Sequence, residues 1–245
     1  MPDDLSETEK PSASALRKEP GRARMWRWAR LGLRFLAVAA TGYLAWVVLM
    51  IAVYRFVDPP MSDLMLAKAW QGQGIEQAWL PLEDMPPALV KAVLISEDAQ
   101  YCQHWGVDWP SMIWAWQHGG GGASTIPMQT VKNLFLWSGR SYVRKAVELP
   151  LAYVTSAAWG KRRMLEIYLN IAEWGPGVYG VDAAAHYHFK TGARQLSPTQ
   201  ASLLAAALPS PLRRSAAAPG RQTREHANRV RRQIGGAEAY LDCVL

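Results

Sequence analysis

The sequence predicts a mainly α-helical domain preceded by one transmembrane helix. Three observations support this fold class. Apolar residues recur at helical spacing along most of the chain, whereas alternating strand patterns are few. One stretch near the N-terminus is uncharged and long enough to cross a bilayer. With 245 residues, the chain has room for one sizeable domain and an anchor, but not for two large domains.

Residues 35–55 are expected to form the membrane anchor. The segment from Phe35 to Tyr54 is uncharged, and its twenty residues span roughly the 30 Å of a bilayer core as a helix. A cleaved signal peptide would have a shorter apolar core of about 7–15 residues, so a retained anchor is favoured. Five arginines precede the anchor without an acid among them, from Arg22 to Arg34. This bias predicts a basic cytoplasmic tail over residues 1–34 and an exported remainder.

The rest of the chain divides into a linker and one helical domain. Asp58-Pro-Pro60 ends the anchor helix, so residues 56–84 are expected to be a linker and residues 85–245 the domain. Pro86-Pro87 opens a helix whose next residues are too apolar for the surface, and this helix carries Glu97 near its C-terminal end.

Helix-terminal signals define the later elements. The glycine run at 119–122 is expected to be a turn, and Gly160 is expected to separate two helices. Ser197, followed by a proline and by Gln200, predicts a capped helix start. Together, these signals predict helices over residues 126–136, 142–158, 161–173, 181–189 and 198–208, and a final basic helix over residues 221–233.

Two glutamates bracket the chemically most distinctive segment. Glu97 follows an apolar run, where an ionised carboxylate is costly unless it faces a cleft; a surface carboxylate at a helix end is the alternative. Glu148 lies three residues after Lys145 and four after Arg144, so it can pair with either on a helix, as in a plain surface salt bridge. Asp98 is expected to cap a helix or to pair structurally.

Hydroxyl groups and cations occupy the interval between the two glutamates. Ser124 and Thr125 lead into an expected helix whose N-terminus presents free N–H groups to an anion. Four cations follow within a short stretch, although such runs are usually a solvated face: Lys132, Arg140, Arg144 and Lys145. The formal net charge of +7 fits nucleic acid, anionic lipid or an acidic substrate, so the position of these cations must decide.

Histidine, cysteine and tryptophan leave structural alternatives open. His104 and Asp108, four residues apart, are interpreted as a hydrogen-bonded pair rather than as metal ligands, and no residue is assigned to a metal. Cys102 and Cys243 are either two free thiols or one non-catalytic disulfide. The tryptophans at positions 105, 109, 114 and 116 fit ordinary core or a membrane interface.

A series of motifs in this order resembles the peptidoglycan glycosyltransferases, the transglycosylase domain family of class A penicillin-binding proteins. Residues 95–109 are similar to their EDxxFxxHxGxD motif, 122–133 to GGSTITQQxxKN, 144–148 to RKxxE, and 165–170 to ILExYLN. The chain is most similar to the monofunctional biosynthetic members, because no transpeptidase motif follows. It departs from the family at Pro127-Met128, where Thr-Gln is usual, while the next glutamine is kept as Gln129.

The resemblance implies a lysozyme-like helical domain that polymerises lipid II into glycan strands by inverting transfer and releases undecaprenyl diphosphate. Glu97 would be the general base and Glu148 the second catalytic carboxylate. The diphosphate would be bound by Ser124, Thr125, Gln129, Lys132, Arg140 and Lys145. Glu148 has three open roles: to orient these cations, to hold a divalent cation such as Mg²⁺ or Mn²⁺, or to protonate the leaving group. No cofactor is otherwise assigned.

The same resemblance implies where the protein acts and with what. Its expected partners are lipid II, the nascent glycan chain, the membrane and other cell-wall synthesis or division proteins, but no nucleic acid. It is expected to be a single-pass protein of the bacterial inner membrane with a periplasmic domain. One alternative is a lytic transglycosylase or lysozyme-like hydrolase, which would have no use for a cation cluster between its carboxylates. The other is an inactive membrane-tethered scaffold.

Overall fold

The computed structural model describes residues 20–119, 122–139 and 141–244, so residues 1–19 of the expected tail lie outside the described residues. The described part of the chain forms two compact units, which divide between residues 49 and 50. Helix α1 (Pro20–Tyr54) makes up the described part of the first unit and continues into the second. Its stretch Arg24–Tyr54 is long and apolar enough to cross a membrane. The anchor expected over residues 35–55 is therefore part of a longer helix.

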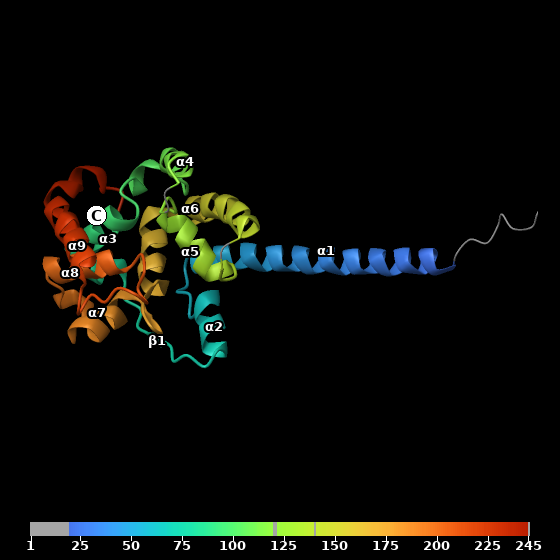
Figure 1. The fold of residues 1–245 in the computed structure, drawn as a ribbon, viewed down its shortest axis with the longest axis horizontal. Coiled ribbons are helices and arrows are strands. Elements are labelled where there is room, and N and C mark those ends of the chain that lie inside the picture. Colours follow the sequence, from blue (N-terminus) through green and yellow to red (C-terminus); the bar gives the residue numbers. More distant parts are fainter. Residues whose placement is uncertain (1–19, 120–121, 140, 245) are drawn as a thin grey trace, which may run out of the picture. The chain divides into compact units, whose positions relative to one another are not determined.

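Helices make up most of the second unit, as Figure 1 shows. The α-helices after α1 are α2 (Asp63–Trp70), α3 (Pro87–Glu97), α4 (Trp109–Gln117), α5 (Ile126–Phe135), α6 (Tyr142–Ile171), α7 (Val181–Phe189), α8 (Pro198–Ala207) and α9 (Arg221–Gln233). Short 3-10 helices are η1 (Leu82–Asp84), η2 (Tyr101–Gln103), η3 (Ala193–Gln195) and η4 (Ile234–Tyr240). The expected mainly α fold is confirmed.

A small sheet accompanies the helices, although the sequence predicted no strand in particular. Its strands are β1 (Glu76–Gln77), β2 (Glu173–Gly175) and β3 (Val178–Tyr179), in the order β1-β3-β2. β1 runs parallel to β3, and β2 runs antiparallel to it. Strands of two or three residues are too short to produce a recognisable alternation of apolar and polar residues.

Helix α3 lies in the core and ends at the first candidate glutamate. Its apolar side chains are almost completely shielded from solvent: Leu89, Val90, Ala92, Val93 and Leu94. The helix packs against α8 and α9, which lie beside it in Figure 1. Burial of one leucine or valine contributes about 1.5–3 kcal/mol, so Glu97 stands at the end of a firmly held helix.

The sequence predicts two helices over residues 142–158 and 161–173, and the structure joins them as α6. The backbone leaves helical geometry at Gly160, with φ 70° and ψ 175°. A positive φ is readily adopted only by glycine, which explains the predicted stop. The second part ends at Ile171, two residues earlier than predicted, because Glu173 already belongs to β2.

Three predictions for the C-terminal part of the domain are confirmed. The helices expected over residues 181–189 and 221–233 coincide with α7 and α9. The cap before α8 is also present: Gln200 N donates to Ser197 Oγ at 3.3 Å, and Ser197 N donates to Gln200 Oε1 at 2.9 Å. Reciprocal bonds of this kind satisfy backbone donors that the first turn of a helix leaves free.

Residues 56–84, expected to be a linker, contain α2, β1 and η1. Ser62 caps α2 by accepting a hydrogen bond from Met65 N at 3.2 Å. Further along, the side chain of Asn170 accepts a hydrogen bond from Leu80 N at 2.8 Å and donates one to Leu80 O at 2.9 Å. These bonds satisfy the backbone of a segment without long elements and fix it to α6.

Cys102 and Cys243 form a disulfide across 141 residues of sequence, which decides between the two alternatives. The bond joins η2 to the C-terminal segment. Leu241 and Val244 in that segment are buried, and Arg162 Nη1 from α6 donates a hydrogen bond to Val244 O at 2.5 Å. The C-terminal segment is thus fixed to the domain by covalent, polar and apolar contacts.

Candidate active site

Glu97, the last residue of α3, contacts a glutamine in α5. Gln129 Nε2 donates a hydrogen bond to Glu97 Oε2 at 2.9 Å, and the hydroxyl of Tyr168 in α6 donates to Gln129 Oε1 at 3.3 Å. An amide has one donor end and one acceptor end, so these two bonds fix its orientation. Side chains from three helices therefore determine the position of one carboxylate oxygen.

The other oxygen of this carboxylate, Glu97 Oε1, is buried and has no hydrogen-bond partner among the described residues. Burial raises the pKa of Glu97 above its ordinary value, and the neighbouring Asp98 adds to the rise. The Gln129 hydrogen bond and the cations Lys132 and Arg214 lower the pKa, but by less. The result is a carboxylate more basic than usual, with one oxygen available to accept a proton from a hydroxyl group.

Asp98 has a structural role, as expected, but the predicted pairing of His104 with Asp108 is wrong. His104 Nε2 lies 2.8 Å from Asp98 Oδ1, and His104 Nδ1 accepts a hydrogen bond from Gly106 N at 3.1 Å. Asp108 instead caps α4 by accepting a hydrogen bond from Ser111 N at 3.0 Å. The prediction failed because the residues between the two do not form an α-helix, so a separation of four does not bring side chains together.

The N-terminus of α5 is fastened to this loop and to α3. Asp98 Oδ2 accepts a hydrogen bond from Ile126 N at 2.9 Å. Thr125 is the N-cap: its hydroxyl accepts a hydrogen bond from Met128 N at 3.3 Å and donates one to Gly106 O at 2.6 Å. A Cβ on Gly106 would lie 2.6 Å from a backbone oxygen of α6, so this close approach requires glycine. The hydroxyl of Thr125 is therefore committed to structure.

The departure from the family pattern at Pro127-Met128 is accommodated by the start of α5. Pro127 lies in the first turn, where a helix does not use the N–H that proline lacks. Met128 is fully buried in the core and contributes no side chain to the site. Gln129, which follows them, keeps its contact with the carboxylate.

Glu148 is buried, and both of its oxygens bind cations from the preceding turn of α6. Arg144 donates a hydrogen bond to Oε1, and Lys145 Nζ donates one to Oε2 at 3.1 Å. The separations of three and four residues agree with the expected salt bridges within one helix. The Glu148 side chain is only 2% exposed, however, so these salt bridges are not at the surface. A buried carboxylate with charge-assisted bonds to two cations fixes their orientation.

Ser124 connects the two glutamates. Its hydroxyl accepts a hydrogen bond from Lys145 Nζ at 2.8 Å, and its carbonyl oxygen accepts one from Gln129 Nε2 at 3.4 Å. Because Gln129 also binds Glu97 and Lys145 also binds Glu148, an unbroken series of contacts runs from one carboxylate to the other. We call these five residues the glutamate relay.

Lys132 lies beside the glutamate relay. Burial lowers the pKa of its ammonium group, and the nearby Arg144 and Lys145 lower it further. Both glutamates raise the pKa of Lys132, so it lies within electrostatic range of each. Together with Arg144, Lys132 lines a pocket of about 380 Å³. Two cations of the site therefore line a space that an anion can enter.

One predicted site residue is not described by the structure, and three residues of the site were not predicted from the sequence. Arg140 lies outside the described residues. Arg144 belongs to the site, and its place in the cation cluster was a usable signal, although it was not assigned a substrate role. Tyr168 and Arg214 were missed. Tyr168 lies among the apolar positions of α6, and Arg214 lies in the segment after α8. Neither belongs to a sequence pattern that indicates a catalytic site.

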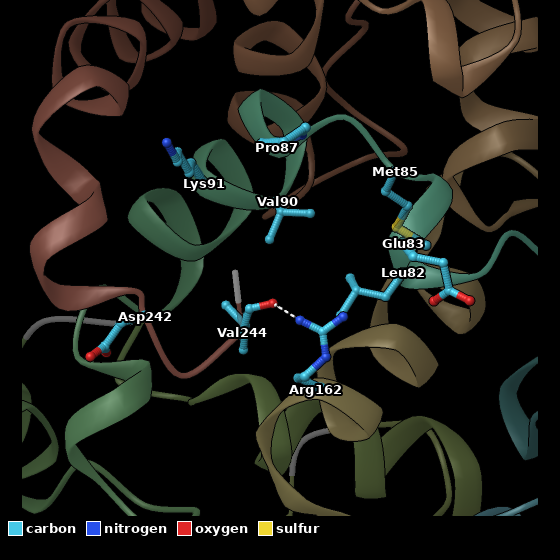
Figure 2. A pocket seen from close by; sticks show the side chains of 9 residues that line it. All are labelled: Leu82, Glu83, Met85, Pro87, Val90, Lys91, Arg162, Asp242 and Val244. Atoms are coloured by element: carbon cyan, nitrogen blue, oxygen red, sulfur yellow. Dashed lines mark hydrogen bonds between the residues drawn. The ribbon is translucent and has the colours of Figure 1, made fainter.

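Two pockets at opposite ends of α3 differ in chemistry. A small one of about 110 Å³ is lined by Glu97, Ser124 and Thr125 among others. Figure 2 shows the other, of about 500 Å³, where Arg162 points toward the C-terminal segment. Pro87, in its lining, lies ten residues from Glu97 on one helix, which is roughly 15 Å. This second pocket is separate from the candidate active site.

The residues around Glu148 do not fit a divalent metal ion. Both carboxylate oxygens already bind cationic side chains, and Lys132 adds a third positive charge nearby. Hard divalent cations need several oxygen ligands. No cluster of three histidine, cysteine, aspartate or glutamate side chains that could hold a metal occurs in the described part of the chain. The metal-binding role left open for Glu148 is therefore not supported.

A helical domain with a basic glutamate beside a group of cations has the general features of an enzyme that transfers a group from a phosphorylated donor. The family model described as Transglycosylase matches residues 64–235. A biosynthetic peptidoglycan transglycosylase of Agrobacterium fabrum is 51% identical over 204 residues, covering 80% of this chain and 90% of that protein. Its counterpart from Rhizobium meliloti is 45% identical over 226 residues, covering 90% and 95%.

A protein of the same description from Rhizobium etli is 48% identical over 214 residues, covering 85% of this chain and 91% of its own. The chain therefore belongs to the transglycosylase family, whose biosynthetic members are peptidoglycan glycosyltransferases. The expected enzyme class and the polymerisation of glycan chains are confirmed, and neither the lytic nor the scaffold alternative is favoured.

Proposed function

We propose that this protein polymerises lipid II, the undecaprenyl-pyrophosphoryl disaccharide-pentapeptide, at the outer face of the bacterial inner membrane. The glutamate relay carries this proposal, because a proton acceptor and a group of cations then share one site. Inverting transfer from a sugar diphosphate needs both: a base for the incoming hydroxyl group and positive charge for the leaving group.

Glu97 is the general base of this mechanism. The 4-hydroxyl of the acceptor sugar attacks the anomeric carbon of the growing chain, and its proton passes to the free oxygen of Glu97. The raised pKa of Glu97 supports this role, because a base works best when its pKa approaches the operating pH. Such a group typically contributes on the order of 10²–10⁴-fold to the rate.

The cations receive the leaving group. As the bond from the anomeric carbon to the diphosphate oxygen breaks, the electron pair leaves with undecaprenyl diphosphate. Lys132 and Lys145 neutralise this charge with Arg140 and Arg144. Ser124 holds the Lys145 ammonium through the bond at 2.8 Å. Thr125, Gln129 and Glu148 act differently from this group, because Thr125 caps α5, Gln129 binds Glu97, and Glu148 is itself an anion.

Those three residues position the site. Thr125 fixes the start of α5, and Gln129 holds Glu97. Glu148 orients Arg144 and Lys145; of its open roles, this is the one that its contacts favour. Both of its oxygens already accept hydrogen bonds from these two cations.

The expected topology has three supporting observations. Helix α1 is long and apolar enough to span a bilayer, and arginines precede its apolar part. The Cys102–Cys243 disulfide fits an oxidising exported compartment. Trp105, Trp114 and Trp116 are 72%, 60% and 85% exposed, which favours a membrane interface over core for this segment.

One substrate comparison tests the proposal. Purified full-length protein is incubated with lipid II or with mature sacculi, and the products are separated by chromatography. We expect glycan strands from lipid II and no soluble muropeptides from sacculi. Glu97→Gln should form strands at a rate lower by about 10²–10⁴-fold. Muropeptide release without synthesis would establish the lytic alternative, and inactivity on both substrates would favour the scaffold.

A further inference from the structure

An unusually basic segment follows the last family motif. Residues 213–232 contain seven arginines and one glutamate, but no lysine or aspartate. The glutamate, Glu225, already binds Arg221, whose Nε lies 2.8 Å from its carboxylate. The mechanism above uses none of these arginines as a substrate ligand. Their number within one short segment makes this surface a candidate for a second anion site.

Helix α9 turns most of these arginines toward solvent. Its buried positions are Thr223, Ala227 and Val230, which recur at helical spacing and face the domain. The opposite side is lined by exposed arginines at positions 221, 224, 229, 231 and 232, and Arg213 is exposed in the preceding turn. We call these six residues the α9 arginine surface. With 13 residues, α9 extends it over about 20 Å.

Arg214 connects this surface to the candidate active site. Its guanidinium is half-buried and donates a hydrogen bond to Ala206 O at 3.2 Å, at the end of α8. From there its charge acts on both Glu97 in α3 and His226 in α9. Arg229 acts on His226 as well. Arg214 therefore lies within electrostatic range of Glu97 and of α9, and α3, which carries Glu97, packs against α9.

We propose that the α9 arginine surface binds the carboxylates of peptide stems on the glycan strand. This inference rests on the proposed function, which supplies a polymer with one stem on each repeating unit. The guanidinium group of arginine is planar, and its N–H donors match the two oxygens of a carboxylate. A surface that serves only solubility could contain lysine equally well. A strand with repeated stems can occupy several arginines at once, so weak single contacts combine.

A lipid surface is the less suitable occupant. Helices that lie on bilayers combine cations with exposed tryptophan, phenylalanine or leucine. Between residues 190 and 237, Leu212 is the one strongly exposed large apolar side chain in the described part of the chain. The exposed tryptophans lie instead in and near α4. The α9 arginine surface thus offers charge without the apolar contacts that hold a helix in a membrane.

The test measures binding of soluble, uncrosslinked glycan strands to the full-length protein in detergent. Strands with intact peptide stems are compared with strands from which an amidase has removed the stems. The variant is Arg221→Gln with Arg224→Gln and Arg229→Gln. The control loses the same charge outside α9, through Lys68→Gln, Lys190→Gln and Arg194→Gln. Circular dichroism verifies that both are folded.

We expect the wild type to bind strands with stems about tenfold more tightly than strands without them. The α9 variant should lose this preference, while the control keeps it within about twofold. Equal binding by the wild type and the α9 variant, or an equal loss in the control, would overturn the proposal. Displacement of the strands by a short-chain anionic phospholipid, but not by free stem peptide, would assign the surface to lipid.

Polymerisation of lipid II, measured in parallel, separates this inference from the proposed function. The α9 variant changes no residue of the active site, so its initial rate should match that of the wild type. A chain that polymerises lipid II but does not distinguish strands by their stems would refute only the α9 proposal. A chain that binds stems selectively but forms no polymer would refute only the proposed function.

Discussion

The ammonium group of Lys145 donates a hydrogen bond to the hydroxyl of Ser124 at 2.8 Å, across 21 positions of sequence. This bond joins the cations of α6 to the segment that precedes α5. Gln129 then continues the connection to Glu97. Ser124 is thus the point where the base and the cation group become one site.

Ser124→Ala should therefore weaken the reaction without unfolding the protein. Hydrogen bonds to charged groups contribute about 1.5–3 kcal/mol, so we expect kcat/KM for lipid II to fall by about tenfold or more. Lys145→Ala should lower it further. In a double-mutant cycle, Ser124→Ala should add little to Lys145→Ala, because the bond is already lost. Fully additive losses would show that the two residues act independently, and Ser210→Ala provides the matched control.

Glu97→Gln should stabilise the fold while it lowers activity. The folded-state pKa of Glu97 is raised by burial, so folding favours the protonated carboxyl group over the ionised one. The stability associated with the protonated form is complete below the unfolded pKa of about 4.3 and is lost as pH rises through the folded pKa. Glutamine has no such charge to bury.

Thermal unfolding across a pH series measures this effect. We expect the melting temperature of Glu97→Gln to exceed that of the wild type at pH 7, and the two to converge below about pH 4. Glu76→Gln, at an exposed carboxylate, serves as the control and should not raise the melting temperature at pH 7. A variant that is less stable than the wild type at neutral pH would mean that the ionised carboxylate is well stabilised, and would weaken its assignment as the base.

Gln129→Ala should move the acidic limb of the pH–rate profile to higher pH. The Gln129 hydrogen bond lowers the pKa of Glu97, because it favours the ionised carboxylate. Its removal therefore raises that pKa, and activity should fall off at a higher pH as the solution is acidified. The profile of kcat/KM for lipid II reports this group in the free enzyme. An unchanged acidic limb would separate Gln129 from the base.

Local sequence signals predicted the parts of the fold that depend on neighbouring residues. The cap at Ser197 and the stop at Gly160 each follow from a few adjacent positions, and both are present. The segment 56–84 could not be predicted in the same way. Its order depends on Asn170, which lies about 90 positions later and binds the backbone of Leu80.

In the candidate site, too, some features could be predicted from local sequence, whereas others depend on contacts between distant residues. Glu97, Lys145 and Glu148 stand out by residue type and by the order of their motifs. The pairing of His104 with Asp98 does not, because it depends on how η2 folds back toward α3. The role of Tyr168 in orienting Gln129 is likewise visible only once α5 and α6 are packed together.

Replacing both cysteines, Cys102→Ser with Cys243→Ser, should lower stability but retain activity at 25 °C. The disulfide closes a loop of 141 residues, and the loss of such a cross-link typically costs about 2–5 kcal/mol. The loop around η2 has a second attachment, because Lys161 Nζ donates hydrogen bonds to the carbonyl oxygens of Tyr101 and His104. Asp98 should therefore keep its partner.

Denaturant unfolding of the full-length protein, with and without a reductant, measures this loss. The wild type should lose stability when reduced, whereas the double serine variant should be insensitive to reductant and as unstable as the reduced wild type. The rate of lipid II polymerisation by the variant should stay within about threefold of the wild type, because the contacts around Glu97 do not include the sulfur atoms. A large loss of activity in a variant that remains folded would instead show that the covalent link from η2 to the C-terminal segment positions the active site.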